Sequence, residues 1–402
     1  MVSEHASPLA ALGGADAGGQ NVYVAELSAH LARRGHQVTV YTRRDDPELP
    51  ERVVTAEGFD VVHVTAGPAA PLPKDELWPL MPAFGDRLAT LWAQQPPDIA
   101  HAHFWMSGTA ALRGAQHLPT AVVQTYHALG TVKRRHQGTE DTSPAARVAT
   151  ETRIARESDA VIATCSDEVA ELAAMGVPTG HVTVVPCGVD ADHFAPVTPD
   201  ASTGPATGVR RRLLAVGRLV PRKGFDRAVR ALKHVPDTEL LIAGGPAPDR
   251  LPADPEAVRL LKTAVEHGVA DRVTLLGGVG HQDMPRLMSG ADLVLSIPWY
   301  EPFGIVPLEA MACRTPVLAT AVGGQLDTVT DGVTGVLVPP GDEPALVRAL
   351  TQLLTDPDRL IRLGAAGRQR VLERYTWDRV TDGVTRVYHR LAAAPTPTGD
   401  HR

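Results

Sequence analysis

The stretch Pro298-Trp-Tyr-Glu-Pro-Phe-Gly-Ile-Val-Pro-Leu-Glu-Ala-Met-Ala-Cys313 decides the fold of this chain. The apolar run Asp292–Ile297 leads into it and predicts a buried strand. Prolines and a glycine then predict a loop, and Pro307 suits the first turn of a helix, because its missing N–H would be unpaired there anyway. The pattern therefore predicts a strand, a loop and a helix, with Glu301 in the loop and Glu309 in the first helical turn.

This layout suits the binding of a sugar nucleotide. The backbone N–H groups of Phe303, Gly304 and Ile305 can point at phosphate oxygens or sugar hydroxyls, with support from the helix dipole. A carboxylate only accepts hydrogen bonds, so one of Glu301 and Glu309 could hold the ribose diol and the other the hexose. On the pattern alone, a solvated loop glutamate and a glutamate that stabilises a helix N-terminus would explain it as well.

The segment E-P-F-G-I-V-P-L-E-A-M-A resembles the signature of the retaining family 4 glycosyltransferases. That group includes sucrose-phosphate synthases, mycothiol-pathway glycosyltransferases and bacterial glycan mannosyltransferases. The motif is long and specific, and other features of the family lie along most of the chain. The resemblance implies the GT-B architecture, an α/β fold of two Rossmann-like, doubly wound domains with a cleft between them.

The composition is that of an ordinary globular protein, 44% hydrophobic and 21% charged, and 402 residues allow two or three domains. A net charge of −7 favours neither nucleic acid nor a membrane surface as a partner. No apolar run approaches the ~18 residues of a membrane span, and the first residues lack the pattern of a signal peptide. Three scattered cysteines predict neither a disulfide framework nor a zinc site, so we expect a reduced, cytoplasmic protein.

Apolar runs alternate with helical segments in two series, which predicts parallel sheets with ligand sites at the carboxyl ends of the strands. The predicted strands are 38–41, 61–64, 99–103, 121–126, 161–164 and 182–185 in the first series, and 212–217, 240–243, 273–276, 293–296, 317–319 and 335–338 in the second. Helices of the first series are expected near 79–94, 107–116, 144–158 and 167–175.

We therefore predict an acceptor-binding domain at 1–190 and a nucleotide-sugar-binding domain at 209–376. Residues 191–208 are rich in proline, threonine and glycine, which indicates a linker. The helix from Trp377 resembles the terminal helix of the family, which implies that 377–402 cross back onto the first domain.

Residues Val2–His5 predict a very short first strand, followed by the glycine-rich run Leu12–Asn21 and a helix. A glycine-rich loop before a helix N-terminus can bind an anion, although this spacing matches no nucleotide-binding fingerprint and also suits a flexible turn. The resemblance implies that Gly18 and Gly19 lie beside the donor phosphate.

Histidines fall at the ends of two predicted strands, but they do not predict a metal site. His101 and His103 lack a third ligand at a useful spacing, and Asp190-Ala-Asp192 lies beside the linker. His127 resembles the family histidine that contacts the donor hexose. We therefore expect transfer that needs no metal and no other cofactor.

Arg218 and Lys223 lie in a predicted loop between a strand and a helix. Arginine can bind a phosphate with two hydrogen bonds, and lysine adds a mobile charge. The resemblance implies that this pair holds the nucleotide diphosphate and stabilises it as it leaves, with Arg222 a less favoured contact. The predicted catalytic set is then Glu301, Arg218, Lys223 and His127, with retention by attack on the same face of the sugar.

The acceptor is predicted to bind to the first domain, with Asn21, His103, Phe104, Lys133 and Arg147 as candidate contacts. Members of the family that use phosphorylated acceptors typically have tyrosine at the position of Phe104 and threonine at that of Ala128. Loss of both hydroxyls removes two donors from a phosphate that needs several, although both replacements could also be neutral. We expect an acceptor without phosphate, such as a cyclitol, a sugar or a small-metabolite hydroxyl.

Together these patterns predict a retaining glycosyltransferase that moves a hexosyl sugar from a nucleotide diphosphate donor, expected to be UDP-linked, to a small molecule. A homodimer is an option for its assembly. The alternatives are a sugar-nucleotide epimerase of the same fold and a non-catalytic protein that binds sugar nucleotides. Neither would be expected to carry the two glutamates together with Arg218 and Lys223.

Overall fold

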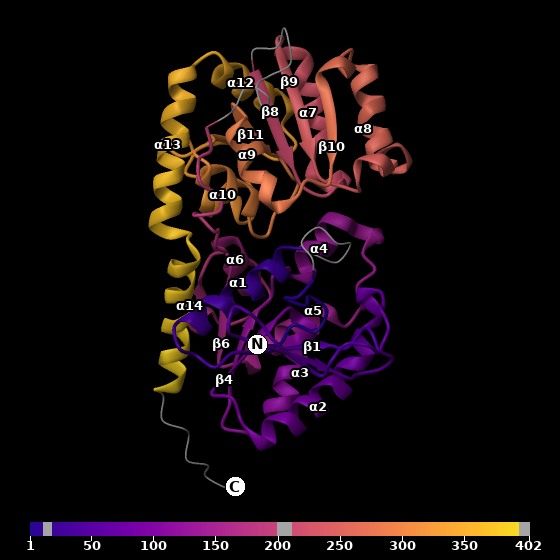
Figure 1. Ribbon diagram of the computed structural model, residues 1–402, viewed down its shortest axis with the longest axis vertical. Helices are drawn as coiled ribbons and strands as arrows, with labels where there is room; N and C mark the ends of the chain where they lie inside the picture. Colours follow the sequence, from indigo (N-terminus) through magenta and orange to yellow (C-terminus); the bar gives the residue numbers. More distant parts are fainter. Residues whose placement is uncertain (11–17, 199–210, 394–402) are drawn as a thin grey trace. The chain divides into compact units, whose positions relative to one another are not determined.

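The computed structural model describes residues 1–10, 18–198 and 211–393. The chain divides into two compact units (Figure 1), one made of Met1–Pro186 with Trp377–Arg402 and the other of Cys187–Thr376. Each unit is an open α/β sheet flanked by helices, as the alternating pattern predicts.

The sheet of the first unit has two halves that meet at Val2. One half has the order β1-β3-β2 and the other β4-β5-β6-β7. Val2 forms parallel bridges with Tyr41 of β1 and Ala102 of β4, so the short first strand joins the halves. The strands are β1 (Thr39–Arg43), β2 (Arg52–Val54), β3 (Asp60–Val64), β4 (Ile99–His103), β5 (Ala121–Thr125), β6 (Ala160–Ala163) and β7 (Val182–Val184). Every residue of β6 is buried, which is why such strands read as continuous apolar runs.

The helices of the first unit include the last helix of the chain. They are α1 (Gly19–Arg33), α2 (Met81–Gln94), α3 (Trp105–Ala115), α4 (Gly130–Gln137), α5 (Arg147–Glu157), α6 (Ser166–Ala174) and α14 (Trp377–Ala392), with 3₁₀ turns η1 (Lys74–Glu76), η2 (Trp78–Leu80), η3 (Gly138–Glu140) and η4 (Thr179–His181). The ring of Trp377 packs 5.5 Å from that of Tyr23, and Arg34 donates a 2.7 Å hydrogen bond to Asp382. Helix α14 is therefore part of the first unit, although the second unit precedes it in sequence.

The second unit contains a parallel sheet with the order β10-β9-β8-β11-β12-β13. Its strands are β8 (Arg211–Val216), β9 (Thr238–Ala243), β10 (Val273–Gly277), β11 (Leu293–Ser296), β12 (Val317–Thr320) and β13 (Val336–Val338). The main helices are α7 (Phe225–Ala231), α8 (Pro255–Glu266), α9 (Met284–Ser289), α10 (Ile305–Ala312), α11 (Gln325–Thr328), α12 (Glu343–Leu354) and α13 (Pro357–Arg374). The 3₁₀ turns are η6 (Pro221–Lys223), η7 (Leu232–His234), η8 (Pro248–Ala253), η9 (Ala270–Arg272) and η10 (His281–Asp283).

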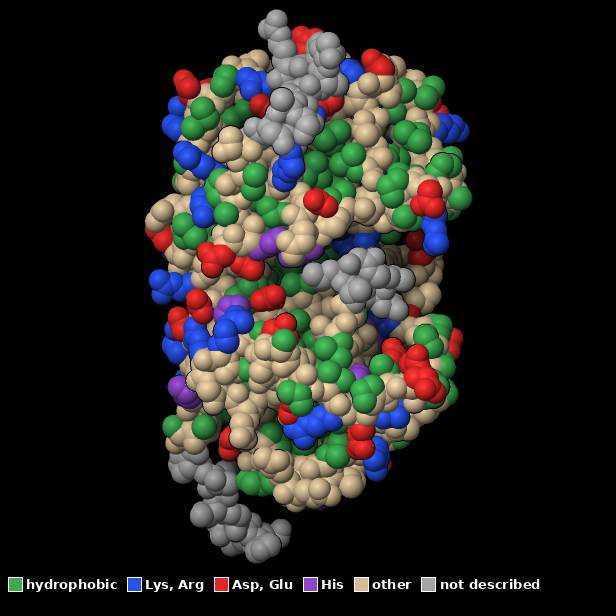
Figure 2. All heavy atoms as spheres, viewed as in Figure 1, with side chains coloured by type: hydrophobic (Ala, Val, Ile, Leu, Met, Phe, Trp, Pro, Cys, Tyr) green, Lys and Arg blue, Asp and Glu red, His purple; other side chains and the backbone are tan. Residues whose placement is uncertain are grey.

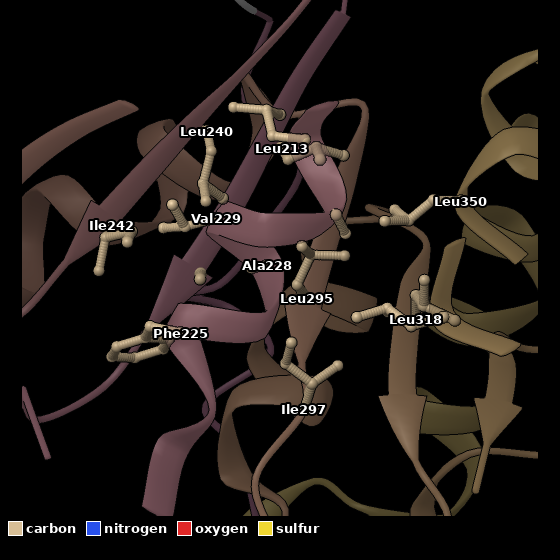
Figure 3. Packing of buried hydrophobic residues seen from close by; sticks show 14 of the residues in the cluster. Leu213, Phe225, Ala228, Val229, Leu240, Ile242, Leu295, Ile297, Leu318 and Leu350 are labelled. Carbon is tan, nitrogen blue, oxygen red and sulfur yellow. The ribbon is translucent and has the colours of Figure 1, made fainter. Parts of the chain in front are cut away.

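Two apolar clusters cover the two faces of this sheet. Figure 3 shows one of them, in which Phe225 and Val229 of α7 face strand residues such as Leu240. The other cluster brings Leu308 and Met311 of α10 against the opposite face. Helices on both faces make the unit doubly wound, which confirms the predicted fold class.

Several local predictions differ from the structure. Strand β2 was not predicted, and it runs antiparallel to β3 as an edge strand. Helix α10 begins at Ile305, so Glu309 lies one turn further into the helix than predicted. Ala191 and Phe194, in the first part of the predicted linker, are buried in the second unit, while 199–208 lie outside the described residues.

The surface bears both acidic and basic side chains. On the face in Figure 2 they are interspersed, and no broad area of one charge is visible. Among the described residues, none of the helices combines the length and the apolar content that crossing a membrane requires.

Candidate active site

Two loops of the second unit meet where β8 and β11 lie side by side. The strand order reverses at this point, and ligands of open α/β sheets bind at the carboxyl ends of strands there. The N–H of Trp299 donates a 2.9 Å hydrogen bond to the carbonyl of Arg222. Gly224 has a φ of +71°, and a Cβ at this position would overlap the carbonyl oxygen of Ile297. A glycine is therefore needed for the close approach of the two loops.

Lys223 and Glu301 form an ion pair at this junction. The Lys223 Nζ lies 2.5 Å from Oε2 of Glu301, and the side chains are only 15% and 13% exposed. Burial raises the pKa of Glu301, but the charges of Lys223, Arg222 and Arg218 outweigh it and bring the pKa below its usual value. The structure thus brings predicted catalytic residues together, and it adds Arg222 to the charges that act on Glu301.

Glu309 lies on α10, also close enough to Lys223 to feel its charge. Burial raises the pKa of Glu309 to about 8, and the charge of Lys223 opposes that rise only in part. In this state the carboxyl group is protonated at neutral pH, so it can donate as well as accept hydrogen bonds with a diol.

A glycine pair that sequence reasoning missed supports the loop around Glu301. The N–H of Gly324 donates a 2.9 Å hydrogen bond to the carbonyl of Glu301, and a Cβ at Gly323 would overlap the same oxygen. Gly304, with a φ of +70°, is the N-cap of α10. The available signal for the pair was two consecutive glycines in the loop that follows the predicted strand 317–319.

His127 belongs to the first unit and lies between β5 and α4. Its φ of +61° is uncommon for a residue other than glycine. The Nε2 of His127 lies 3.0 Å from Nδ1 of His103. Burial, with smaller effects from the charges of His5 and Lys74, lowers the pKa of His127 to about 3, so the ring is neutral at physiological pH.

Two candidate acceptor contacts are already engaged within their own unit. Arg147 donates to Glu151 at 2.8 Å, to the carbonyl of Ala128 at 2.8 Å and to Ser143 at 3.1 Å. Lys133 pairs with Asp141 at 3.1 Å.

Asn21 holds the start of α1 through both ends of its amide. It accepts from the N–H of Gly18 at 3.1 Å and donates to the carbonyl of Ser7 at 2.9 Å. Gly19 is the first residue of α1, and residues 12–17 of the predicted glycine-rich loop lie outside the described part. The structure therefore gives Asn21 a capping role.

Phe104 lies at the other predicted acceptor position, with a φ of +80° before α3. The Nζ of Lys74 is 3.6 Å from the centroid of its ring, and the ring of His5 is 5.1 Å from it. Sequence reasoning missed Lys74. The rarity of lysine was a usable signal. The chain has only five lysines, and Lys223, another of the five, is a predicted site residue.

The segment Asp190-Ala-Asp192 has a local structural role. Asp190 Oδ1 accepts 3.0 Å hydrogen bonds from the N–H groups of Asp192 and His193. Nowhere in the described ranges do three histidine, cysteine or acidic side chains gather as metal ligands.

Two family descriptions match consecutive parts of the chain. Residues 17–193 match Glycosyltransferase Family 4, and residues 205–370 match Glycosyl transferases group 1. The D-inositol 3-phosphate glycosyltransferase of Xylanimonas cellulosilytica is 38% identical over 96% of this chain and 95% of its own length. The protein of the same name from Mycobacterium tuberculosis is 36% identical over 97% of this chain and 82% of its own length.

Solved structures show the same architecture. Sucrose-phosphate synthase from Thermosynechococcus elongatus is 34% identical, with a TM-score of 0.87 over 98% of both chains. Anabaena HepE, solved in complex with UDP, is 17% identical, with a TM-score of 0.76 over 97% of this chain and 98% of its own.

Proposed function

The chain belongs to glycosyltransferase family 4, with the GT-B fold, and on that premise we propose a retaining transfer of a hexosyl sugar from a nucleotide diphosphate donor to a small-molecule hydroxyl. We propose a UDP-linked donor, which agrees with the UDP named for the HepE complex. A cytoplasmic location and a homodimeric state remain predictions.

The Lys223–Glu301 pair at the reversal point of the sheet carries this proposal. Lys223 and Arg218 would stabilise the charge that develops on the departing diphosphate. Glu301 would hold the hexose, and Glu309 would bind the ribose diol. Arriving phosphate oxygens would take over the ammonium of Lys223 from Glu301, which frees the carboxylate for sugar hydroxyls.

The reacting groups need no metal in this proposal. Two cationic side chains supply the charge stabilisation that a divalent ion supplies elsewhere. The leaving phosphate would accept the proton of the acceptor hydroxyl on the same face of the sugar. His127, neutral at physiological pH, would hydrogen-bond the hexose from the first unit.

We propose an acceptor without phosphate, in contrast to the relatives named for D-inositol 3-phosphate. Phe104 and Ala128 have no hydroxyl to offer a phosphate. Arg147 and Lys133 are paired with Glu151 and Asp141, so their charge is largely neutralised. Within the described residues Lys74 forms no ion pair, and one ammonium is a weak match for a dianion.

The test combines donor and acceptor screens on the purified chain. Thermal shift with UDP-, GDP- and ADP-glucose ranks the donors, because a ligand at about 100 times its Kd adds roughly 2.7 kcal/mol of stability. Transfer from the best donor is then measured to myo-inositol, glucose and fructose, and to their phosphate esters, with the anomer of the product assigned by NMR.

We expect UDP-glucose to be hydrolysed slowly and to give an α-linked product with a free polyol. Absence of hydrolysis and transfer with every donor would refute the proposed reaction. A kcat/KM at least tenfold higher for an ester than for its parent polyol, about 1.4 kcal/mol, would refute the proposed acceptor class.

A further inference from the structure

Three buried polar side chains lie beside the loop that carries Glu301, which spans residues 297–304 between β11 and α10. They are Ser296, the last residue of β11, Thr320, the last residue of β12, and Gln325, the first residue of α11. The other residues of the two strands are apolar, with the sequences Leu-Val-Leu and Val-Leu-Ala. Polar groups therefore enter the interior of the second unit at the point where the loop begins.

The side chain of Gln325 joins the ends of the two strands. It is 0% exposed, and its Nε2 donates a hydrogen bond to the hydroxyl of Ser296. Its Oε1 lies 3.3 Å from the hydroxyl of Thr320. That hydroxyl in turn donates to the carbonyl oxygen of Pro298 at 2.7 Å. The network thus extends from the amide of Gln325 to the backbone of the loop.

The same side chain also lies close to the other end of the loop. A Cβ at Gly304, the N-cap of α10, would be 3.6 Å from Cγ of Gln325. Between the two ends, the carbonyl of Glu301 is held by the N–H of Gly324, directly before Gln325. The start of α11 therefore contacts the beginning, the middle and the end of the loop.

Stability of the fold does not require an amide at this position. Burying a polar group costs free energy unless it is hydrogen-bonded, and replacing hydrogen-bonded partners with apolar groups of the same shape can be nearly neutral. What apolar packing lacks is direction, whereas a satisfied buried network specifies one arrangement of the groups that it joins. The network around Gln325 is therefore better suited to fixing the position of the loop than to adding stability.

The position of this loop matters because it sets the distance between Glu301 and Lys223. Their ion pair, at 2.5 Å, joins the loop to the turn before α7. Groups of an active site must be held within about 0.5 Å of their productive geometry, and a misplacement of about 1 Å can lower a rate by roughly a hundredfold.

We propose that Gln325, through Ser296 and Thr320, is a positioning residue that fixes the loop 297–304 and so places the carboxylate of Glu301 for the donor sugar. Gln325 acts through the loop and needs no contact with the donor. The inference rests on the proposed glycosyl transfer and deepens it, because it assigns the order of the donor loop to a network behind the site.

Four variants separate the hydrogen bonds from the packing. Gln325→Met keeps the length and the apolar contacts of the side chain but removes the amide. Thr320→Val removes the hydroxyl at nearly constant shape, and Thr320→Ser keeps it. The control Gln352→Met changes an exposed glutamine of α12 in the same unit.

The first measurement is hydrogen–deuterium exchange of the full chain without ligand. In Gln325→Met and Thr320→Val, peptides that cover 297–304 should exchange about threefold faster or more, because the opening of the loop becomes easier. Peptides from α8 should exchange as in the wild type. Thr320→Ser should stay close to the wild type, and Gln352→Met should match it.

The second measurement is hydrolysis of the best donor as a function of pH. For Gln325→Met and Thr320→Val, kcat/KM should fall by roughly tenfold or more. The acid limb of the profile should also move to higher pH, because a displaced Glu301 loses part of the charge of Lys223 that lowers its pKa. A purely structural role would lower the Tm and leave that limb in place.

Unchanged exchange of the loop in Gln325→Met would overturn the inference, as would faster exchange spread evenly over the second unit. Faster exchange of the loop with an unchanged rate and acid limb would also count against it. If Gln325→Met does not fold, the Thr320 pair decides, and equal effects of valine and serine would refute a role of the hydroxyl. Absence of hydrolysis in the wild type would instead refute the proposed function.

Discussion

Replacing Lys223 with alanine should remove most donor turnover while the second unit stays folded. The pair that Lys223 forms with Glu301 is largely withdrawn from water, at 2.5 Å and with exposures of 15% and 13%. Removing one partner of a buried pair costs about 3–5 kcal/mol, less than the 5–15 kcal/mol stability typical of a domain. Glu301 can also limit the cost by taking up a proton.

Because the variant stays folded, its lower stability should by itself cost little activity. The loss of activity should instead come from the missing charge in the site. Without Lys223, a preorganised positive charge is missing where the diphosphate departs, and kcat/KM for donor hydrolysis should fall by about 10²–10³-fold. The matched control is Lys233→Ala, which removes an exposed lysine of the same unit.

The pH dependence of Lys223→Ala provides a second readout. The folded pKa of Glu301 is depressed, so the carboxylate contributes stability at neutral pH that is lost as the pH falls below its usual value of 4.5. Removing Lys223 raises that pKa, and the acid limb of the donor-hydrolysis profile should move to higher pH. A folded Lys223→Ala variant with kcat/KM within threefold of the Lys233→Ala control would refute this reasoning.

Three further predictions follow from the site. Because the folded pKa of Glu309 is raised to about 8 from 4.5, stability should decline as the pH rises between these values, and Glu309→Gln should flatten that decline in a Tm–pH series; an unchanged slope would contradict the assignment. Transfer should persist in excess EDTA, whereas a loss that manganese or magnesium restores would favour a metal site. Gly224→Ala should lower the unfolding free energy by about 1–3 kcal/mol more than Gly268→Ala in chemical denaturation, because both glycines have a positive φ but only Gly224 faces the carbonyl of Ile297; equal losses would show that the overlap is relieved at no cost.

The fold was predictable from the sequence because buried parallel strands leave a strong local trace. Strand β11 has four buried residues, of which the first three are apolar, and Leu293 and Val294 needed no tertiary information to be assigned. Strand β2 left no such trace, because it is a three-residue edge strand with exposed Arg52 and Val54. Helix α4 was not among the predicted helices, since its polar sequence carries no apolar periodicity.

The candidate site was predictable only as far as local motifs reach. Residues Glu301 and Lys223 were identified from separate segments, but their pairing joins positions 78 apart in the sequence. The acceptor residues were harder to predict, because the role of a cation depends on its partner. Arg147 reads as a free charge until Glu151 and the carbonyl of Ala128 are seen to engage it.

Helix α14 gives the chain an unusual order of assembly. The second unit is one continuous segment, whereas the first is split and needs residues from both ends of the sequence. The ribosome therefore releases a complete second unit while the first still lacks the helix that carries the buried Trp377 and Val384. In topological terms the second unit is an insertion in the first, tethered at two points, so a single cut of the backbone leaves the units joined.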